Sequence, residues 1–369
     1  KTFYILPTIK PDARQYLMDS PNTQSSPRSG LVPMDNDRDG QYDEDGYDDL
    51  NNDGVISTMR RKSPFGTYKT NPRDPRQMIR TEPGEKGEYE VLGQEGIDND
   101  GDGLVNEDGP GGYDPNRDYG FNWEPSYIQS GAGKYPFSFP ENQAVRDFGF
   151  SHRNITGAQS FHNYGGLILR GPSMQGGGAE IFSRADDDVL NSIGKKGELI
   201  IPGYRFITLW KDMYTVYGGE LDWWHGAIGS YVFSNELWNE TMMFNDTSSV
   251  DPYEFDRLLL FEDSFMPWQE VDHPDYGKVE VGGFNKNFGR THPGFLLESD
   301  AHRNAAFCIY NAWVTPKLEV RDVKVTNLGG GLKEVSATVV NSQMMPTHSG
   351  NNLKYKIDHP DYVTLEGGS

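Results

Sequence analysis

The pattern of apolar and polar residues after residue 110 predicts alternating helices and strands. In residues 230–237, Val232, Ser234 and Glu236 fall on one face of a strand, because successive side chains alternate. Residues 138–148 begin with Ser138-Phe-Pro-Glu141, a capping box with proline in the first turn, and are predicted to form a helix. Further predicted helices span 222–229 and 299–313, and further predicted strands span 2–7, 158–164, 318–325 and 333–340.

Composition argues against two classes of protein. The 369 residues include 34 Lys+Arg and 55 Asp+Glu, which gives a formal net charge of −21. A chain this acidic repels phosphate backbones, so we expect no nucleic-acid partner. No apolar run approaches the roughly 18 residues of a transmembrane helix, so we expect no membrane span.

Two acidic stretches form an internal repeat. Asp35-Asn-Asp-Arg-Asp-Gly-Gln-Tyr-Asp-Glu-Asp-Gly46 aligns with Asp98-Asn-Asp-Gly-Asp-Gly-Leu-Val-Asn-Glu-Asp-Gly109, and eight of the twelve positions are identical. Alternate carboxylates followed by a glycine at a sharp turn suit Ca²⁺, which takes about six to eight oxygen ligands. A solvated acidic loop is the alternative, but the regular spacing and the recurrence favour calcium. The expected ligands are Asp35, Asp37, Asp39, Asp43, Asp45, Asp98, Asp100, Asp102, Asn106 and Asp108.

A third acidic loop follows the first repeat. Asp49-Leu-Asn-Asn-Asp-Gly-Val-Ile56 begins like an EF-hand or dockerin loop, with oxygen donors on Asp49, Asn51 and Asp53. Arg60 stands where an EF-hand has its bidentate glutamate, so the remaining ligands must come from elsewhere. The loops at 35–56 and 98–109 resemble thrombospondin type 3 repeats, which implies a structural role for calcium.

Four separated fragments carry a resemblance to a known family. They are Asp114-Pro-Asn-Arg117, Ser160-Phe-His-Asn-Tyr-Gly-Gly166, Tyr214-Thr-Val-Tyr-Gly-Gly-Glu-Leu-Asp-Trp223 and Ser230-Tyr-Val-Phe-Ser-Asn-Glu-Leu237, with Pro11-Asp12 near the start. In this order they resemble the zinc carboxypeptidases of the M14 family, over roughly residues 1–313. With the acidic loops the chain resembles secreted members from Bacteroidota-type bacteria. The resemblance implies an α/β fold, with a twisted mixed sheet flanked by helices and the active site at the carboxyl ends of strands.

The resemblance also implies roles for single residues. His162 matches a zinc ligand, and Glu236 matches the general base that takes a proton from the zinc-bound water. Asn116 and Arg117 match the pair that binds the terminal carboxylate of the substrate. Asp114 matches the carboxylate that orients another zinc ligand.

Three further roles follow from the same resemblance. Arg60 matches the arginine that stabilises the oxyanion, although the alignment there crosses an insertion. Tyr214 matches the tyrosine on the loop that closes over the substrate. Leu221, together with Val216 and Leu209, falls where the family lines the pocket for the last side chain, which implies a preference for apolar or aromatic C-terminal residues. Glu220 is expected to point away from that pocket, as a strand-like neighbour would.

One part of the family pattern is missing from this chain. The first two zinc ligands of the family lie in a His-x-x-Glu motif, and none of the eight histidines has a glutamate three residues later. Either the motif lies upstream of Lys1, or the protein is a scaffold that no longer binds zinc. The intact enzyme is favoured, because Asn116, Arg117, His162, Tyr214 and Glu236 are all retained, but residues 1–369 alone are expected to be inactive.

Two functions from different classes therefore stand side by side. The first is a secreted zinc metallocarboxypeptidase with structural Ca²⁺, located outside the cell, at its surface or in the periplasm, which acts on peptide or protein C-termini. The second is a non-catalytic, calcium-stabilised protein of binding or adhesion on the same scaffold. The expected domains are a carboxypeptidase-like domain at 1–316 and a partial, immunoglobulin-like β-sandwich at 317–369.

Overall fold

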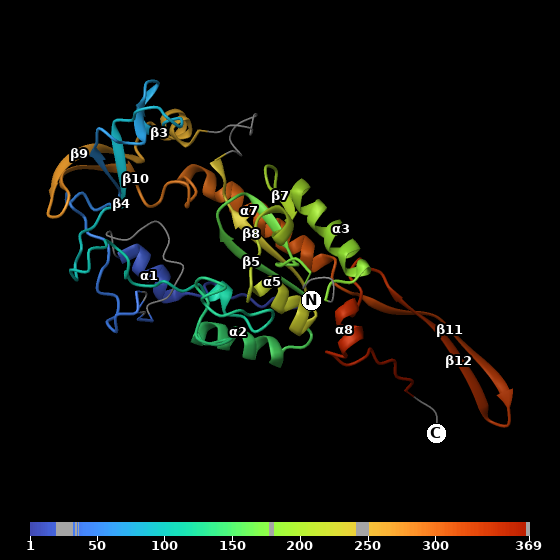
Figure 1. The fold of residues 1–369 in the computed structure, drawn as a ribbon. Helices are drawn as coiled ribbons and strands as arrows, with labels where there is room; N and C mark the ends of the chain where they lie inside the picture. The colour runs from blue at the N-terminus through green and yellow to red at the C-terminus, as the bar shows by residue number, and fades with distance from the viewer. Residues whose placement is uncertain (20–31, 34, 36, 177–180, 241–250, 367–369) are drawn as a thin grey trace. The chain divides into compact units, whose positions relative to one another are not determined.

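The structure describes residues 1–19, 32–33, 35, 37–176, 181–240 and 251–366. It is a computed structural model in which the chain forms two units, each assembled from separate stretches of sequence. The first unit comprises residues 1–3, 116–237 and 294–369, and the second comprises residues 4–115 and 238–293. The predicted domain limits at 1–316 and 317–369 are not the limits of these units, and they stay a prediction. Figure 1 shows the elements of both units.

A four-stranded mixed sheet forms the centre of the first unit. Its strands are β5 (Gly157–Asn163), β6 (Leu167–Arg170), β7 (Arg205–Thr208) and β8 (Tyr231–Leu237), in the order β5-β8-β6-β7. The pairs β5–β8 and β6–β7 are parallel, and the pair β6–β8 is antiparallel. The helices α3 (Arg184–Ile200) and α7 (Gly294–Trp313) pack on this sheet, α3 against β6, β7 and β8 and α7 against β5 (Figure 1). The expected α/β fold, a mixed sheet with flanking helices, is confirmed.

Shorter elements complete the first unit. A 3-10 turn, η1 (Pro115–Arg117), leads into it from the second unit. The others are α2 (Pro140–Ser151), α4 (Leu209–Asp212), α5 (Glu220–Trp223), η3 (Trp224–Ile228), β11 (Leu318–Gly329), β12 (Leu332–Asn341) and α8 (Gly350–Tyr355).

The burial pattern explains why α3 covers the sheet. Leu190, Ile193, Gly194 and Gly197 are buried along one face of the helix, at the spacing of an amphipathic helix. A Cβ atom at Gly194 would lie 2.2 Å from a ring carbon of Phe206 in β7. The absence of a side chain at this position therefore allows the helix to approach the strand closely.

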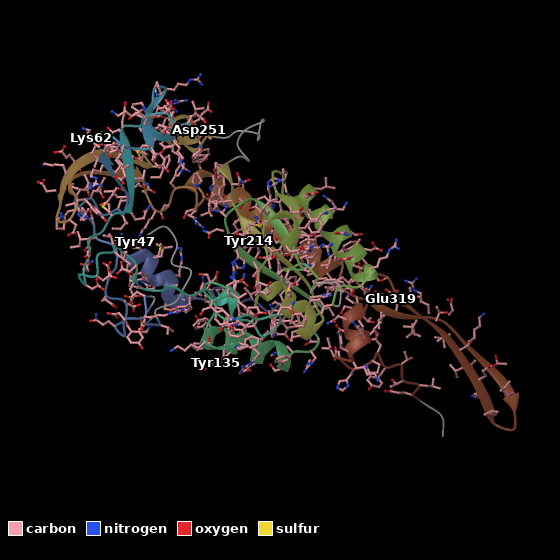
Figure 2. The ribbon with its side chains drawn as sticks, in the orientation of Figure 1. Tyr47, Lys62, Tyr135, Tyr214, Asp251 and Glu319 are labelled. Atoms are coloured by element: carbon pink, nitrogen blue, oxygen red, sulfur yellow. The ribbon has the colours of Figure 1, made fainter. Side chains whose placement is uncertain are left out.

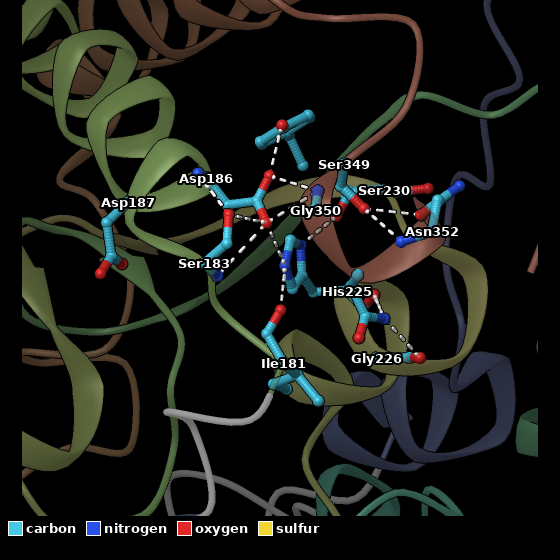
Figure 3. Close-up of polar contacts among 12 residues, drawn as sticks. Ile181, Ser183, Asp186, Asp187, His225, Gly226, Ser230, Ser349, Gly350 and Asn352 are labelled. Carbon is cyan, nitrogen blue, oxygen red and sulfur yellow. Dashed lines mark hydrogen bonds and ion pairs between the residues drawn. The ribbon is translucent and has the colours of Figure 1, made fainter. Parts of the chain in front are cut away.

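A buried polar network connects the start of α3 with the C-terminal segment (Figure 3). Ser183 caps α3 by accepting a hydrogen bond from the backbone N–H of Asp186 at 3.1 Å. The Asp186 carboxylate in turn accepts from the hydroxyl of Tyr231 at 2.6 Å and from the N–H of Gly350 at 3.0 Å. The His225 ring is completely buried, and its Nε2 lies 3.8 Å from the same carboxylate. The first residue of α8 is thus bonded to this buried network of the first unit.

An antiparallel sheet of six strands forms the second unit, in the order β3-β2-β4-β1-β10-β9. Met59, Val279 and Val281 form its buried apolar cluster, which explains why β1 and β10 pair although they are far apart in sequence. Its elements are α1 (Pro11–Asp19), β1 (Thr58–Lys62), β2 (Tyr68–Asn71), β3 (Asp74–Arg80), β4 (Tyr89–Gln94), α6 (Pro252–Phe255), η5 (Asp256–Leu260), β9 (Phe265–His273) and β10 (Gly277–Phe284).

The C-terminal strands predicted from sequence are present as a hairpin. β11 and β12 pair antiparallel around Gly329-Gly-Gly331, whose glycines all have positive φ, a conformation that favours glycine. Val320 lies opposite Val339 and Val325 opposite Val335, so these four apolar side chains share one face of the hairpin. The partial β-sandwich expected at 317–369 stays a prediction.

Three expectations for local structure were wrong. Residues 2–7 do not form a buried strand, and the Ile5 side chain is 80% exposed. The capping box at the start of α2 does not form, because Ser138 donates instead to Asp118 at 2.8 Å, and Asp118 also accepts from the N–H of Phe139. Helix α7 begins at Gly294, before the expected start at Ser299.

In the part of the chain that the structure describes, no helix combines the length and apolarity needed to cross a membrane.

Candidate active site

His162 and Glu236 lie side by side at the carboxyl ends of two adjacent strands. His162 is the second-last residue of β5 and Glu236 the second-last residue of β8. The two residues are direct partners in the parallel ladder, so their side chains are on the same face of the sheet. Adjacent strands are about 4.8 Å apart, which is well within the 10 Å that a shared water and metal require. Both residues are half-buried.

Glu220 occupies the inner side of this site. It is the first residue of α5, and only 4% of its surface is exposed. Its Oε1 accepts a hydrogen bond from Nε2 of His162 at 2.8 Å, and it also accepts from the hydroxyl of Ser160. Burial raises the pKa of this carboxyl, but the hydrogen bond and charge of His162 and the hydrogen bonds of Ser160 and Ser234 outweigh burial and lower the pKa.

This position of Glu220 corrects the expectation that its side chain would point away. The segment is a helical turn instead of a strand, so neighbouring side chains do not alternate between opposite faces. Leu221 instead packs in the apolar core with Val216 and Leu209, and each of these three is less than 10% exposed.

Asn116 and Arg117 belong to the turn η1, and Asn116 is bonded to Glu220 of this site. The side-chain oxygen of Asn116 accepts a hydrogen bond from the N–H of Glu220 at 2.9 Å. Arg117 is 8% exposed, and its guanidinium donates to the carbonyl oxygen of Asn116 at 2.8 Å. Gly218, with φ of +63°, lies so close that a Cβ atom there would be 2.6 Å from the carbonyl oxygen of Arg117. Only glycine allows both the positive φ and this close approach, and the contact fixes the position of the turn that contains Arg117.

The remaining residues expected at the site have different environments. Tyr214, which is labelled in Figure 2, lies between α4 and α5, and its side chain is 48% exposed. Asp114 belongs to the second unit, immediately before η1. Nothing in the structure tests the roles predicted for these two residues.

Arg60 is held inside the six-stranded sheet of the second unit. Its guanidinium carbon lies 4.1 Å from the ring centre of Tyr89 and 3.7 Å from that of Trp268. It forms an ion pair with Glu280 at 2.7 Å, and only 5% of the residue is exposed. These contacts explain Arg60 as a structural residue. The predicted oxyanion role gains no support from them and stays a prediction.

The two acidic repeats pair with each other in the second unit. Asp45 and Asp108, which are equivalent in the repeats, form an isolated antiparallel bridge. The N–H of Asn106 in the second repeat donates to the carboxylate of Asp45 in the first at 2.7 Å. Within each acidic loop, carboxylates also accept hydrogen bonds from nearby backbone N–H groups. Asp98, for example, accepts from the N–H groups of Gly101 and Gly103.

Three groups of carboxylates in these repeats are close enough to share an ion. Within each group, ligand atoms lie within 4.8 Å of one another. Two of the groups combine residues from both repeats, so the repeats form joint sites instead of two separate loops. The groups are Asp37, Asp39, Glu44 and Asp100; Asp35, Asp37 and Asp108; and Asp98, Asp100 and Asp102.

Glu44 and Glu107 are additional carboxylates that the spacing argument missed. They are equivalent in the two repeats, and all four of their carboxylate oxygens are buried and accept no hydrogen bond from the described residues. Burial and the nearby carboxylate of Asp108 raise the pKa of Glu44 to about 7. Burial and Asp45 raise the pKa of Glu107 to about 7. The recurrence of Glu at the tenth position of both repeats was the signal in the sequence.

The predicted ligands outside these groups are arranged differently. Asp49, Asn51 and Asp53 form a turn in which each accepts a backbone hydrogen bond, such as Asp49 from the N–H of Gly54 at 2.7 Å. Asp43, Asp45 and Asn106 also belong to none of the three carboxylate groups. The amide of Asn106 instead donates to the carbonyl oxygen of Gln94 at 3.1 Å. For these residues, calcium ligation stays a prediction.

Comparison with known proteins identifies two matching family models. A model described as "Zinc carboxypeptidase" matches residues 45–257, which is more than half of the chain. A model described as "Domain of unknown function (DUF8731)" matches residues 317–369, which are also the limits expected for the C-terminal domain. The second description assigns neither a fold nor an activity to that segment.

One curated relative and several solved structures are also similar to parts of the chain. Carboxypeptidase A1 of Sus scrofa is 30% identical over 141 residues, which are 34% of this chain and 32% of the relative. The chain therefore spans about a third of the relative's length. Carboxypeptidase A from Helicoverpa armigera is 22% identical, with a TM-score of 0.28 over 39% of this chain and 38% of that chain. Bovine thrombin-activatable fibrinolysis inhibitor, in complex with tick carboxypeptidase inhibitor, is 23% identical, with a TM-score of 0.29 over 38% of this chain and 48% of that chain.

Proposed function

The chain belongs to the family of zinc carboxypeptidases, and on this basis we propose that it is a secreted metallocarboxypeptidase that removes the C-terminal residue of peptides. The observation that carries the proposal is the pairing of His162 with Glu236 on adjacent strand ends, beside the turn of Asn116 and Arg117. An imidazole, a carboxylate and a guanidinium are the three groups that such a hydrolysis needs.

His162 fits one ligand position of a zinc site. Its Nε2 is hydrogen-bonded to a buried carboxylate, which is the arrangement that histidine ligands of metals usually have. Within the described ranges, His162 belongs to no group of three donor side chains that could hold a metal, so this chain contributes one ligand of the family's set. Bound zinc would supply a Lewis acid that activates water and polarises the scissile carbonyl.

The residues of this chain would divide the remaining tasks. The Glu236 carboxylate takes a proton from the attacking water and passes it to the leaving amine. The Arg117 guanidinium binds the terminal carboxylate of the peptide with two parallel hydrogen bonds, which places the last peptide bond beside Glu236. Tyr214, with its exposed side chain, covers the bound peptide.

The proposed specificity is for apolar or aromatic C-terminal residues. The proposal rests on the resemblance, in which Leu221, Val216 and Leu209 match apolar positions of the side-chain pocket; in this structure the three side chains are buried together in the core. The Glu220 carboxylate is already bonded to His162 and Ser160, and therefore offers no counter-ion for a lysine or arginine side chain. An unpaired ammonium in such a pocket costs several kcal/mol, so we expect at least about a hundredfold lower rate for basic residues.

The test uses the complete gene product, loaded with zinc, and peptides that differ only in the last residue. We expect faster release of Phe, Tyr or Leu than of Lys or Arg. Glu236→Gln should lower kcat by about 10²–10⁴-fold, because the base is lost while the shape is kept. Glu334→Gln, on the exposed strand β12, is the matched control and should keep full activity. Full activity of Glu236→Gln would disprove the assigned base, and a preference for Lys or Arg would disprove the assigned pocket.

We also propose that the paired acidic repeats bind structural calcium. The support is the four buried carboxylate oxygens of Glu44 and Glu107, which accept no hydrogen bond from the described residues and lie near the carboxylates of Asp108 and Asp45. A bound cation would offset the cost of burying these charges. Asp35, Asp37, Asp39, Asp98, Asp100, Asp102 and Asp108 supply the other oxygens.

A further inference from the structure

Glu220 is a buried carboxylate whose side chain contacts the candidate zinc ligand. Its 4% exposure means that nearly all of its hydration has been removed. A carboxylate without water is costly unless hydrogen-bond donors replace that water. His162 and Ser160 are such donors, and both come from β5, two positions apart on the same face of the strand.

The backbone of Glu220 is fixed as firmly as its side chain. Its N–H donates to the side-chain oxygen of Asn116 at 2.9 Å, and α5 begins directly at this residue. The preceding Gly218 lies against the carbonyl oxygen of Arg117. Hydrogen bonds thus fix both the backbone and the carboxylate of Glu220. The orientation of the His162 ring therefore follows from the position of this carboxylate.

This hydrogen bond has a consequence for the imidazole of His162. A carboxylate is only an acceptor, so the Nε2 atom that faces it must carry the hydrogen. In the neutral ring the lone pair is then on Nδ1. We propose that Glu220 is a positioning residue, which fixes His162 in the Nε2–H tautomer and in the ring orientation that presents Nδ1 to zinc. This inference rests on the proposed function.

The inference explains why a glutamate is found next to the apolar residues of this turn. Leu221 and Trp223, which follow it in α5, are buried in apolar clusters. A charged side chain among such neighbours would be destabilising if it had no specific partner. The cost is offset if the carboxylate increases the basicity of the histidine ligand and fixes its orientation.

The first experiment measures zinc affinity by competition with a chelator, in the complete gene product. Glu220→Gln keeps the shape but removes the charge, and Glu220→Asp keeps the charge but withdraws the carboxylate by one methylene. We expect both to bind Zn²⁺ about 10–100-fold more weakly than the unaltered protein. Glu334→Gln, which exchanges the same groups on exposed β12, should bind zinc with unchanged affinity.

The second experiment observes the tautomer directly. In the zinc-free protein labelled with ¹⁵N-histidine, at a pH where the His162 ring is neutral, we expect the Nε2–H form alone. Glu220→Gln should show a mixture of both tautomers, because its amide both donates and accepts. This readout requires neither bound zinc nor activity, and therefore also serves for a variant of lowered stability.

The possible outcomes separate this inference from the proposed function. Equal zinc affinity of the Glu220 variants and the unaltered enzyme, together with an unchanged tautomer, would disprove the positioning role while leaving the carboxypeptidase assignment intact. Failure of the unaltered protein to bind zinc would overturn the proposed function itself. Weaker zinc binding with a tautomer mixture, at a KM for the peptide changed by less than about threefold, supports the positioning role.

Discussion

Glu220 and Asp222 belong to the same short helix, but their carboxylates have opposite electrostatic environments. Glu220 faces an imidazole and hydroxyl groups, whose combined effect lowers its pKa despite burial. Asp222 is 1% exposed, and burial raises its pKa to about 6 because its backbone hydrogen bonds from Ser173 only partly compensate. From the sequence alone both residues are acidic positions after a glycine pair. The difference arises from their partners, which are His162 and Ser160 of β5 for Glu220 and the loop residue Ser173 for Asp222.

Asp222 should make the stability of the protein depend on pH. Its folded pKa of about 6 lies above the usual 3.8, so the folded state binds the proton more tightly than the unfolded state. The stabilising contribution is complete below about pH 4 and is lost as the pH rises through 6, up to about 3 kcal/mol. Asp222→Asn should therefore gain stability relative to the unaltered protein between pH 4.5 and pH 8, measured by urea unfolding. Asp188→Asn, on the exposed side of α3, is the control, and identical pH profiles for Asp222→Asn and the unaltered protein would refute the prediction.

At the scale of single residues, the sequence predicted which residues form the site but not all of the contacts around them. His162 and Glu236 were identified from their fragments, and the structure brings them together as ladder partners. The role of Glu220 could not be predicted, because it depends on a contact between residues 58 positions apart. The surroundings of Arg60 were equally hidden, since the two rings and the carboxylate around it come from three other strands.

At the scale of elements, the acidic repeats form a pair in which each completes the other. Asp100 of the second repeat approaches Asp37 and Glu44 of the first, and Asp108 approaches Asp35. The spacing of the aspartates was visible in the sequence, whereas the pairing was not. Pairing depends on the backbone bridge between residues 45 and 108, which no local pattern encodes.

Removal of calcium should lower the melting temperature of the protein. An ion at 100 times its Kd stabilises the folded state by about 2.7 kcal/mol, and a chelator removes this contribution. Re-addition of Ca²⁺ should restore the melting temperature, while Zn²⁺ alone should not. Glu107→Gln should weaken the response to calcium because it removes a charge between the repeats, whereas Glu254→Gln, an exposed glutamate of α6, should not. A melting curve that is identical with and without chelator would leave only a solvated acidic loop.

At the scale of the whole molecule, each unit is built from stretches that are not consecutive in the sequence. Residues 238–293 return to the unit formed by residues 4–115, because β10 pairs with β1. Residues at the other end of the chain also pack far from their sequence neighbours. Asn351 donates to the carbonyl oxygens of His225 and Gly226, next to the buried network of Figure 3. Strands and helices were predictable from periodicity, whereas these assignments depend on contacts across hundreds of residues.

The most direct test of the central claim compares two peptides that end in the same phenylalanine, one with a free carboxylate and one with an amide. The claim is that Arg117 holds the terminal carboxylate while Glu236 acts at the last peptide bond, so loss of that charge should remove a charge-assisted hydrogen bond. With the zinc-loaded complete gene product, we predict that the free acid is cleaved roughly 100-fold or more faster, measured as kcat/KM for phenylalanine release against phenylalaninamide release. Equal cleavage of both peptides, or cleavage of neither by protein that contains zinc, would contradict the account.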